Sequence, residues 1–117
     1  MPGANGSSLW HVTLTLCGEA VPTDELRGAL AHLVDERPFM LSVRYASDRV
    51  ELRYWDEGES LDDVAALALR LWGDHRDSAG LPLWSVVALE VLDQSTVQRR
   101  PDEHAPAALV AAGVSPL

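Results

Sequence analysis

Apolar and polar residues alternate along residues 9–17, where Trp10, Val12, Leu14 and Leu16 occupy every second position. Successive side chains of a β-strand point to opposite faces, so a period of two that includes β-branched residues is typical of a half-buried strand. Residues 9–17 are therefore predicted to form a strand with one apolar face in the core and one polar face outside it.

Two further alternating runs, at residues 39–45 and 50–54, predict a β-hairpin that turns at Ser47 and Asp48. A turn with an even number of residues places both apolar sets on one face, because the side-chain period of a strand is two. An odd number would set polar residues of one strand beside apolar residues of the other. The expected cross-strand pairs are Tyr45–Val50, Val43–Leu52 and Leu41–Tyr54.

Two segments carry apolar residues at the spacing of an amphipathic helix. The first covers residues 24–36 and has Thr23 as its expected N-cap. The second follows Ser60, which forms a capping box with Asp63, and is expected to fade into a polar end before a stop at Gly80. Each helix has one apolar stripe, which predicts that each packs against the sheet along one face only.

The apolar run at residues 81–92 predicts a last strand of roughly 8–10 residues. The elements thus follow the order β-α-β-β-α-β, which resembles the ferredoxin-like, split-βαβ arrangement. This resemblance implies one α+β domain over residues 9–93, with a four-stranded antiparallel sheet and two helices on one face. The right-handed crossover rule pairs the first strand with both the third and the last strand. We expect residues 1–8 to form a flexible leader and residues 94–117 a C-terminal tail, with a short packed helix as the alternative for the tail.

Charge and composition narrow the class of protein. The chain has 117 residues, a formal net charge of −9 and nine basic residues, all of them arginine. Nucleic-acid binding relies on a positive face, so this charge argues against a nucleic-acid partner. The absence of lysine excludes a Schiff-base lysine and a Walker-A phosphate loop. Together with the absence of isoleucine, it indicates a GC-rich bacterial genome.

The cysteine content and the apolar runs of the chain bear on its cellular compartment and on its cofactors. A single cysteine, Cys17, allows no intramolecular disulfide, and no Cys/His cluster has the spacing of a zinc site. Residues 1–8 lack the basic and apolar regions of a signal peptide, and the apolar runs are too short to span a membrane. We therefore expect a cytoplasmic protein without a metal or other cofactor and without a membrane partner.

The face of the sheet opposite the helices is the candidate site. In the expected register Tyr54 points to the helices, and its neighbours Arg53 and Trp55 point to this open face. Exposed aromatic residues and arginine are enriched where proteins meet. Three interpretations stay open: a solvated face with one Arg44–Glu51 charge pair, a dimer interface, or a small-ligand site. The candidate ligand or interface residues are His11, Thr13, Met40, Arg44, Arg53, Trp55 and Trp84.

No pattern in the chain indicates a catalytic residue. His11 and Thr13 form a His-x-Thr motif, the half-site of two-histidine phosphoesterases, but no second such motif is present. His11 is therefore interpreted as a polar strand residue, and Cys17 as a structural thiol. The stretch Asp74–Ser78 contains Asp, His and Ser, yet successive helix residues point in different directions, so we expect these groups not to converge.

Two functional hypotheses follow. In the first, the domain is a binding or interaction module that forms a homodimer or docks a protein partner through its open sheet face. In the alternative, a second subunit closes this face into the pocket of a small-molecule-binding protein or a dimeric enzyme. Arg44 and Arg53 would then hold an anionic ligand, and His11 would carry a proton.

Overall fold

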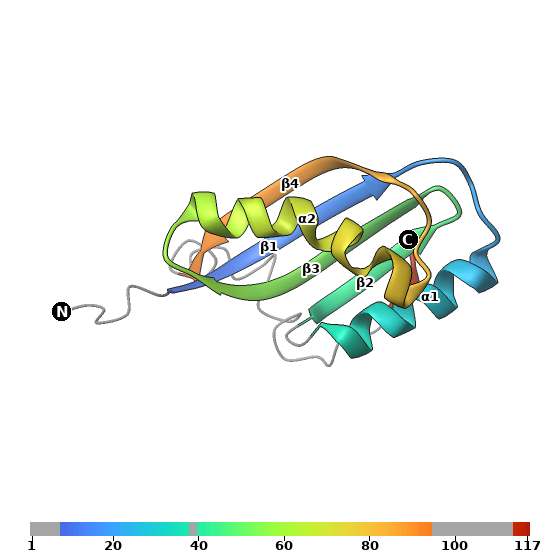
Figure 1. Cartoon of the computed structure of the whole chain (residues 1–117), viewed down its shortest axis with the longest axis horizontal. Coiled ribbons are helices and arrows are strands. Elements are labelled where there is room, and N and C mark those ends of the chain that lie inside the picture. Colours follow the sequence, from blue (N-terminus) through green and yellow to red (C-terminus); the bar gives the residue numbers. More distant parts are fainter. Residues whose placement is uncertain (1–7, 38–39, 95–113) are drawn as a thin grey trace.

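A computed structural model of the chain describes residues 8–37, 40–94 and 114–117. It contains seven helices and strands within these residues (Figure 1). In chain order they are β1 (Ser8–Cys17), α1 (Thr23–Glu36), β2 (Met40–Ala46), β3 (Arg49–Gly58), α2 (Leu61–Ala79), β4 (Ser85–Asp93) and β5 (Val114–Pro116).

The sheet is five-stranded and mixed, with the strand order β4-β1-β3-β2-β5. The expectation of a four-stranded antiparallel, ferredoxin-like sheet is therefore wrong. The additional strand, β5, runs parallel to β2 and pairs Val114 with Val43 and Pro116 with Tyr45. Only three residues long, β5 is too short to show the alternation from which a strand is predicted. The expected antiparallel pairing of β1 with both β3 and β4 is confirmed.

β5 lies within the segment expected to be a C-terminal tail, residues 94–117. The rest of that tail, from residue 95 to residue 113, lies outside the described residues, as does the alternative of a short helix there. Most of the expected leader, residues 1–8, lies outside them as well, and Ser8 already belongs to β1.

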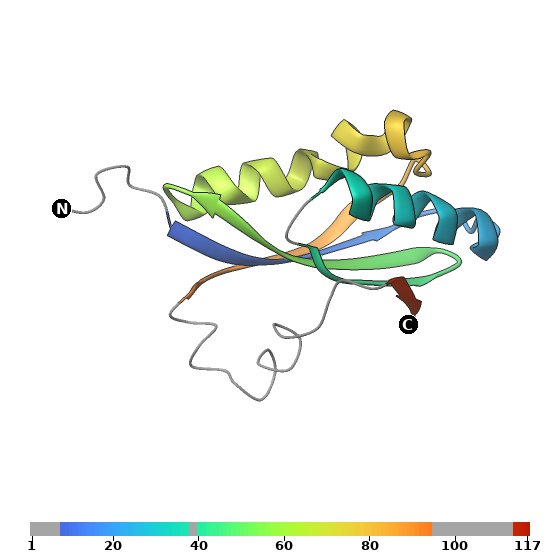
Figure 2. The same ribbon diagram turned by 90° about the horizontal axis from the view of Figure 1, so that it is seen from below.

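Both helices lie on one face of the sheet, as expected (Figure 2). α2 packs on β1, β3 and β4, whereas α1 packs on β2 and β5. Apolar side chains of the strands fill the space beneath them, and the central members are completely buried. Those from the three inner strands are Val12, Leu14, Leu16, Val43, Val50, Leu52 and Tyr54.

The hairpin formed by β2 and β3 has the expected register over most of its length. Tyr45 pairs with Val50 and Val43 with Leu52, and the turn consists of Ser47 and Asp48. The register shifts between Ser42 and Met40, at the beginning of β2, so that Tyr54 pairs with Met40 and not with Leu41. This irregularity places an extra residue in β2 and reverses the faces of the residues before it. Met40 is therefore buried in the core, and its expected place on the open face is wrong.

A second irregularity in register lies between β1 and β4, at Thr15 and Leu16 of β1. Leu16 pairs with Val86, whereas Thr15 pairs with Ala88, so Val87 is the extra residue. Val86 consequently packs against the core.

Trp84 precedes β4 and is buried in the core, which makes its expected place on the open face wrong. Its ring stacks on Trp72 with an interplanar angle of 4° and a centroid distance of 6.0 Å. Its indole Nε1 donates a hydrogen bond to the Glu19 carbonyl oxygen at 2.9 Å. A Cβ atom at Gly18 would overlap the Trp84 ring, so this close packing requires the glycine.

The helix ends agree partly with the sequence signals. α1 begins one residue earlier than expected, with Pro22 as N-cap and no side-chain capping hydrogen bond. In α2 the expected cap is confirmed, because Asp63 N donates to Ser60 Oγ at 3.2 Å. Gly80 ends α2 with φ of 79°, a left-handed conformation that favours glycine. The expected fraying is wrong, since α2 continues to Ala79.

Tyr54 is fully buried beneath the helices, and burial raises the pKa of its hydroxyl to about 12. The Arg37 guanidinium lies over its ring at 5.1 Å, and among the described residues the hydroxyl has no hydrogen-bond partner. Because an unsatisfied buried hydroxyl costs about 1–3 kcal/mol, Tyr54→Phe should leave the free energy of unfolding unchanged or raise it. Urea denaturation checks this, and a loss above about 1 kcal/mol would show that the hydroxyl is satisfied after all.

Candidate functional site

The face of the sheet opposite the helices brings together five of the seven predicted site residues. His11 pairs with Trp55 and Thr13 with Arg53 across β1 and β3. The His11 and Trp55 rings meet edge to face, with centroids 5.4 Å apart and planes at 77°. Arg44 lies opposite Glu51 on β3, as the hairpin register predicted. The two missing members, Met40 and Trp84, are in the core for the reasons given above.

Exposure on this face is uneven. Arg44 is exposed, and Arg53 and Trp55 are half-buried. His11 is only 2% exposed, so its ring has almost no contact with solvent. Arg53 Nε lies 3.5 Å from Glu51 Oε1, and this carboxylate offsets part of the positive charge of the guanidinium. The expected role of His11 as a proton carrier would require a molecule to reach a buried imidazole.

A pocket of about 210 Å³ lies beside this face and includes Trp55 in its lining. The other described lining residues are Leu9, Asp56 and Glu57. Asp56 already forms an ion pair with Arg37, with 3.6 Å between Oδ2 and the guanidinium. Two carboxylates and no arginine among these lining residues give a surface that repels an anion.

A cluster of three polar side chains, Glu36, His75 and Ser78, connects α1 with α2. His75 Nδ1 lies 2.7 Å from Glu36 Oε1, and Ser78 Oγ donates to the same oxygen at 2.7 Å. The expectation that the groups of Asp74–Ser78 do not converge is thus wrong for this pair, because residues three apart share a helix face. The Ser78 hydroxyl donates to Glu36 and to the His75 main-chain carbonyl oxygen and not to the His75 imidazole, so this histidine does not activate it as a nucleophile.

This cluster predicts a pH dependence of stability. The hydrogen bonds from Ser78 and His75, with the charges of His75 and His32, hold the pKa of Glu36 below its ordinary value of 4.5. A depressed carboxyl pKa stabilises the fold above the pKa of the unfolded chain, and this stabilisation is lost as the pH falls through the folded pKa. Glu36→Gln should therefore lower the melting temperature at neutral pH, and the difference from the parent chain should shrink on acidification below about pH 4.

Asp35→Asn provides the matched control, since Asp35 is an exposed carboxylate on the same helical turn. Thermal unfolding monitored by circular dichroism at a series of pH values measures both variants. A difference for Glu36→Gln that stays constant across the acid range would contradict the assignment of the cluster.

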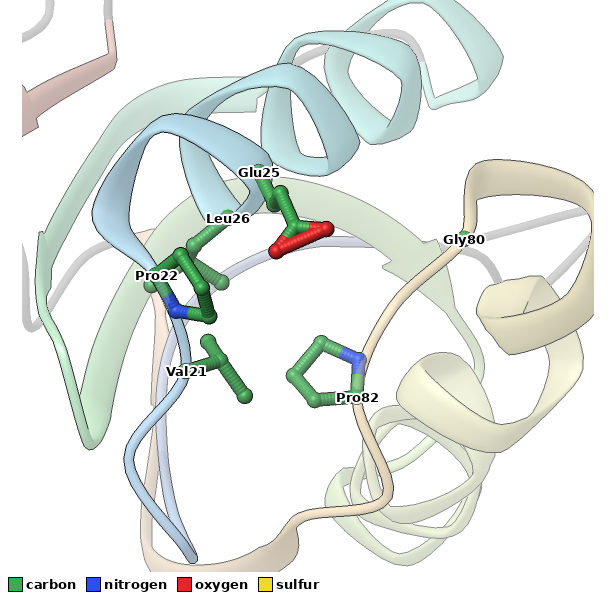
Figure 3. Close-up of a pocket in the computed structure, with 6 residues that line it drawn as sticks. All are labelled: Val21, Pro22, Glu25, Leu26, Gly80 and Pro82. Atoms are coloured by element: carbon green, nitrogen blue, oxygen red, sulfur yellow. The ribbon is translucent and has the colours of Figure 1, made fainter.

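A second pocket, of about 230 Å³, lies where α1 begins and where the chain passes from α2 to β4 (Figure 3). Five of its six described lining residues present apolar or main-chain surface, and the sixth is acidic. The first five are Val21, Pro22, Leu26, Gly80 and Pro82, and the acidic residue is Glu25. Sequence reasoning missed this site, since its residues are far apart in the chain and the strongest signals, Gly80 and the prolines, indicate loops and helix ends.

The segments on either side of this pocket are anchored by tryptophan. Trp72 Nε1 donates to the Pro82 carbonyl oxygen at 2.8 Å, and the Trp84–Glu19 hydrogen bond fixes the segment after β1. The Leu81 and Gly80 amides both donate to the Arg76 carbonyl oxygen at 2.9 Å, which fixes the end of α2. The pocket walls are therefore held by the core and not by loose loops.

The outer edge of β4 is a further candidate surface. The inner side of β4 pairs with β1. Among the described residues, no strand pairs with its outer side. Three large apolar side chains near this edge are exposed: Leu69 (53%), Leu83 (79%) and Val87 (58%). Together with the outer side of β4 they are called the β4 edge patch below.

Leu69 belongs to this patch by helix geometry. Leu69 is nine residues before Ser78. An α-helix turns by about 100° per residue, so nine residues make about two and a half turns and place the two side chains on opposite sides of α2. Ser78 faces α1, because its hydroxyl donates to Glu36 there. Leu69 therefore faces away from α1, and this is the β4 side of the molecule, since α1 covers the half of the sheet formed by β2 and β5.

The fold defines a small α+β domain in which a five-stranded mixed sheet carries two helices on one face. Among the described residues no helix is long and apolar enough to cross a membrane, and no three His, Cys, Asp or Glu side chains gather as a metal site. Residues 9–108 match the family described as Domain of unknown function (DUF8830), and the chain belongs to this family. No curated protein and no solved structure matches the chain.

Proposed function

We propose that this chain is an interaction domain of the bacterial cytoplasm that self-associates, and that the β4 edge patch is the contact surface. The observation that carries the proposal is the difference between the two edges of the sheet. Beside β2 the sheet ends in β5, which is three residues long and contains Pro116, a residue without a backbone N–H. Short strands and proline are the usual protection of a sheet edge.

The β4 edge has much less protection. Its sequence, SVVALEVLD, runs for nine residues without lysine or proline and has only two charged side chains, Glu90 and Asp93. The irregular pairing at Val87 affects the beginning of the strand and leaves Ala88–Asp93 regular. The outer N–H and C=O groups of an edge strand can pair with another strand, and exposed apolar side chains nearby add buried area.

A second copy of β4 fits this edge in antiparallel orientation. When the two-fold axis passes through Leu89, Val87 of one copy lies opposite Val91 of the other, and Ala88 lies opposite Glu90. No two carboxylates are then directly opposed. The pairing would join the two sheets into one continuous sheet.

The open sheet face supports docking less well. Its central residues His11 and Thr15 are buried within the chain itself, at 2% and 7% exposure. The anionic-ligand alternative stays a prediction, but Asp56 and Glu57 line the pocket beside that face and disfavour it. Arg44 is the predicted site residue that remains exposed there.

Light scattering coupled to size-exclusion chromatography tests the proposal. The molar mass should rise from that of the 12.7 kDa chain toward twice this value as the concentration increases through the micromolar range. Each copy has a net charge of −9, so the copies repel one another and added salt should strengthen the association. A mass of one chain at every concentration and salt level would rule out self-association.

A further inference from the structure

We propose that the pocket between α1 and the α2–β4 segment binds a small ligand with an apolar body and a single ammonium group. This inference is independent of self-association, because the pocket residues are not part of the β4 edge patch. The apolar body would contact Val21, Leu26 and the two prolines, and the ammonium group would face Glu25.

The size of the pocket limits the ligand. At about 230 Å³ it is smaller than the roughly 300–1,000 Å³ that hold a drug-sized molecule. It therefore suits one ring or a short alkyl chain. In Figure 3, Val21 and Pro22 lie on one side of the space and Pro82 lies on the other. These side chains and Leu26 give the pocket a lining that is mostly apolar.

Glu25 determines the charge of the ligand. Figure 3 shows its carboxylate between α1 and the segment that carries Gly80 and Pro82. Its neighbour Asp24 has Arg27 at 3.7 Å, whereas no ion pair to Glu25 occurs within residues 8–37, 40–94 and 114–117. The described residues that line the pocket include no arginine and no histidine. A carboxylate without a partner at the rim of an apolar pocket is complementary to a cation that brings its own apolar group.

The other pocket fits such a ligand less well. Its carboxylate Asp56 is already engaged, because it pairs with Arg37 and its Oδ1 accepts a hydrogen bond from Glu57 N at 2.9 Å. It nevertheless contains an aromatic ring, Trp55, and a second carboxylate, Glu57. Any test of the proposal has to distinguish the two pockets.

Phenethylamine is a suitable probe, with phenethyl alcohol as the uncharged analogue of the same shape. Titrations are followed by two-dimensional NMR on the labelled full chain. We expect saturable shifts of the Val21, Leu26 and Gly80 amides with phenethylamine, and at least tenfold weaker binding of phenethyl alcohol. Glu25→Gln should remove this preference for the amine, whereas the matched control Glu57→Gln at the other pocket should leave it intact.

The outcomes that overturn the proposal are distinct. Equal binding of the amine and the alcohol would refute the role of the carboxylate. Loss of amine binding in Glu57→Gln but not in Glu25→Gln would place the ligand in the other pocket. Shifts that fail to saturate would show that neither molecule binds. The spectrum of Glu25→Gln without ligand reports whether the variant is folded, so a misfolded variant is recognised and replaced by Glu25→Ala.

Discussion

Leu52→Ala should lower the free energy of unfolding by about 2–5 kcal/mol. Leu52 is fully buried at the centre of β3, where it pairs with Leu14 on one side and Val43 on the other. Truncation removes the transfer free energy of three carbon atoms and leaves a cavity that neighbours on both strands cannot fill without moving. Urea denaturation followed by tryptophan fluorescence measures the change, and the denaturant dependence should stay the same.

The neighbouring residue supplies the control. Arg53 projects to the opposite face, is half-buried, and has an ion pair with Glu51. Arg53→Ala should therefore cost no more than about 1 kcal/mol. If Arg53→Ala proved as costly as Leu52→Ala, the two faces of β3 would be assigned the wrong way round, and with them the positions of Tyr54 and Trp55.

Val87→Glu should weaken self-association about a hundredfold, which corresponds to about 2.7 kcal/mol. Val87 is exposed on the β4 edge patch, so the substitution leaves the core intact. In a two-fold dimer the change occurs twice, and each new carboxylate approaches the acidic end of the partner strand, which carries Glu90 and Asp93. Analytical ultracentrifugation at several concentrations gives the dissociation constants.

Leu67→Glu is the matched control for this prediction. Leu67 is 47% exposed, comparable to Val87, and lies on the side of α2 that faces away from the β4 edge. The variant changes the net charge by the same amount, so any general effect of charge repulsion appears in both proteins. Equal weakening by the two substitutions would mean that β4 is not the contact surface.

The sequence predicted those parts of the fold in which a regular repeat was long enough to define a face. The hairpin register is an example, since Val43–Leu52 and Tyr45–Val50 follow from alternation alone. The irregular pairings at Met40 and Val87 are not visible in the sequence pattern. The pattern does not show where an extra residue interrupts the pairing of two strands and so changes the face to which the neighbouring side chains point. Met40 was therefore assigned to the wrong face.

Other features depend on contacts between distant segments. Trp84 is apolar and adjacent to a strand, and only the stacking on Trp72 shows that it belongs to the core. The contact of Ser78 and His75 with Glu36 required knowledge of how the two helices pack. β5 owes its place to pairing with β2, and three residues carry no periodic signal of their own. The pocket of Figure 3 likewise arises where α1 meets the α2–β4 segment.

Amide hydrogen exchange along β4 tests the proposed edge pairing most directly. In an antiparallel pair, every second amide of an edge strand points away from its neighbour, so these β4 amides point away from β1. They should become strongly protected as the concentration rises through the association range, whereas the outer amides of β5 should not change. If the mass doubles while β4 exchange stays the same, the contact surface lies elsewhere, and the account of the β4 edge is wrong.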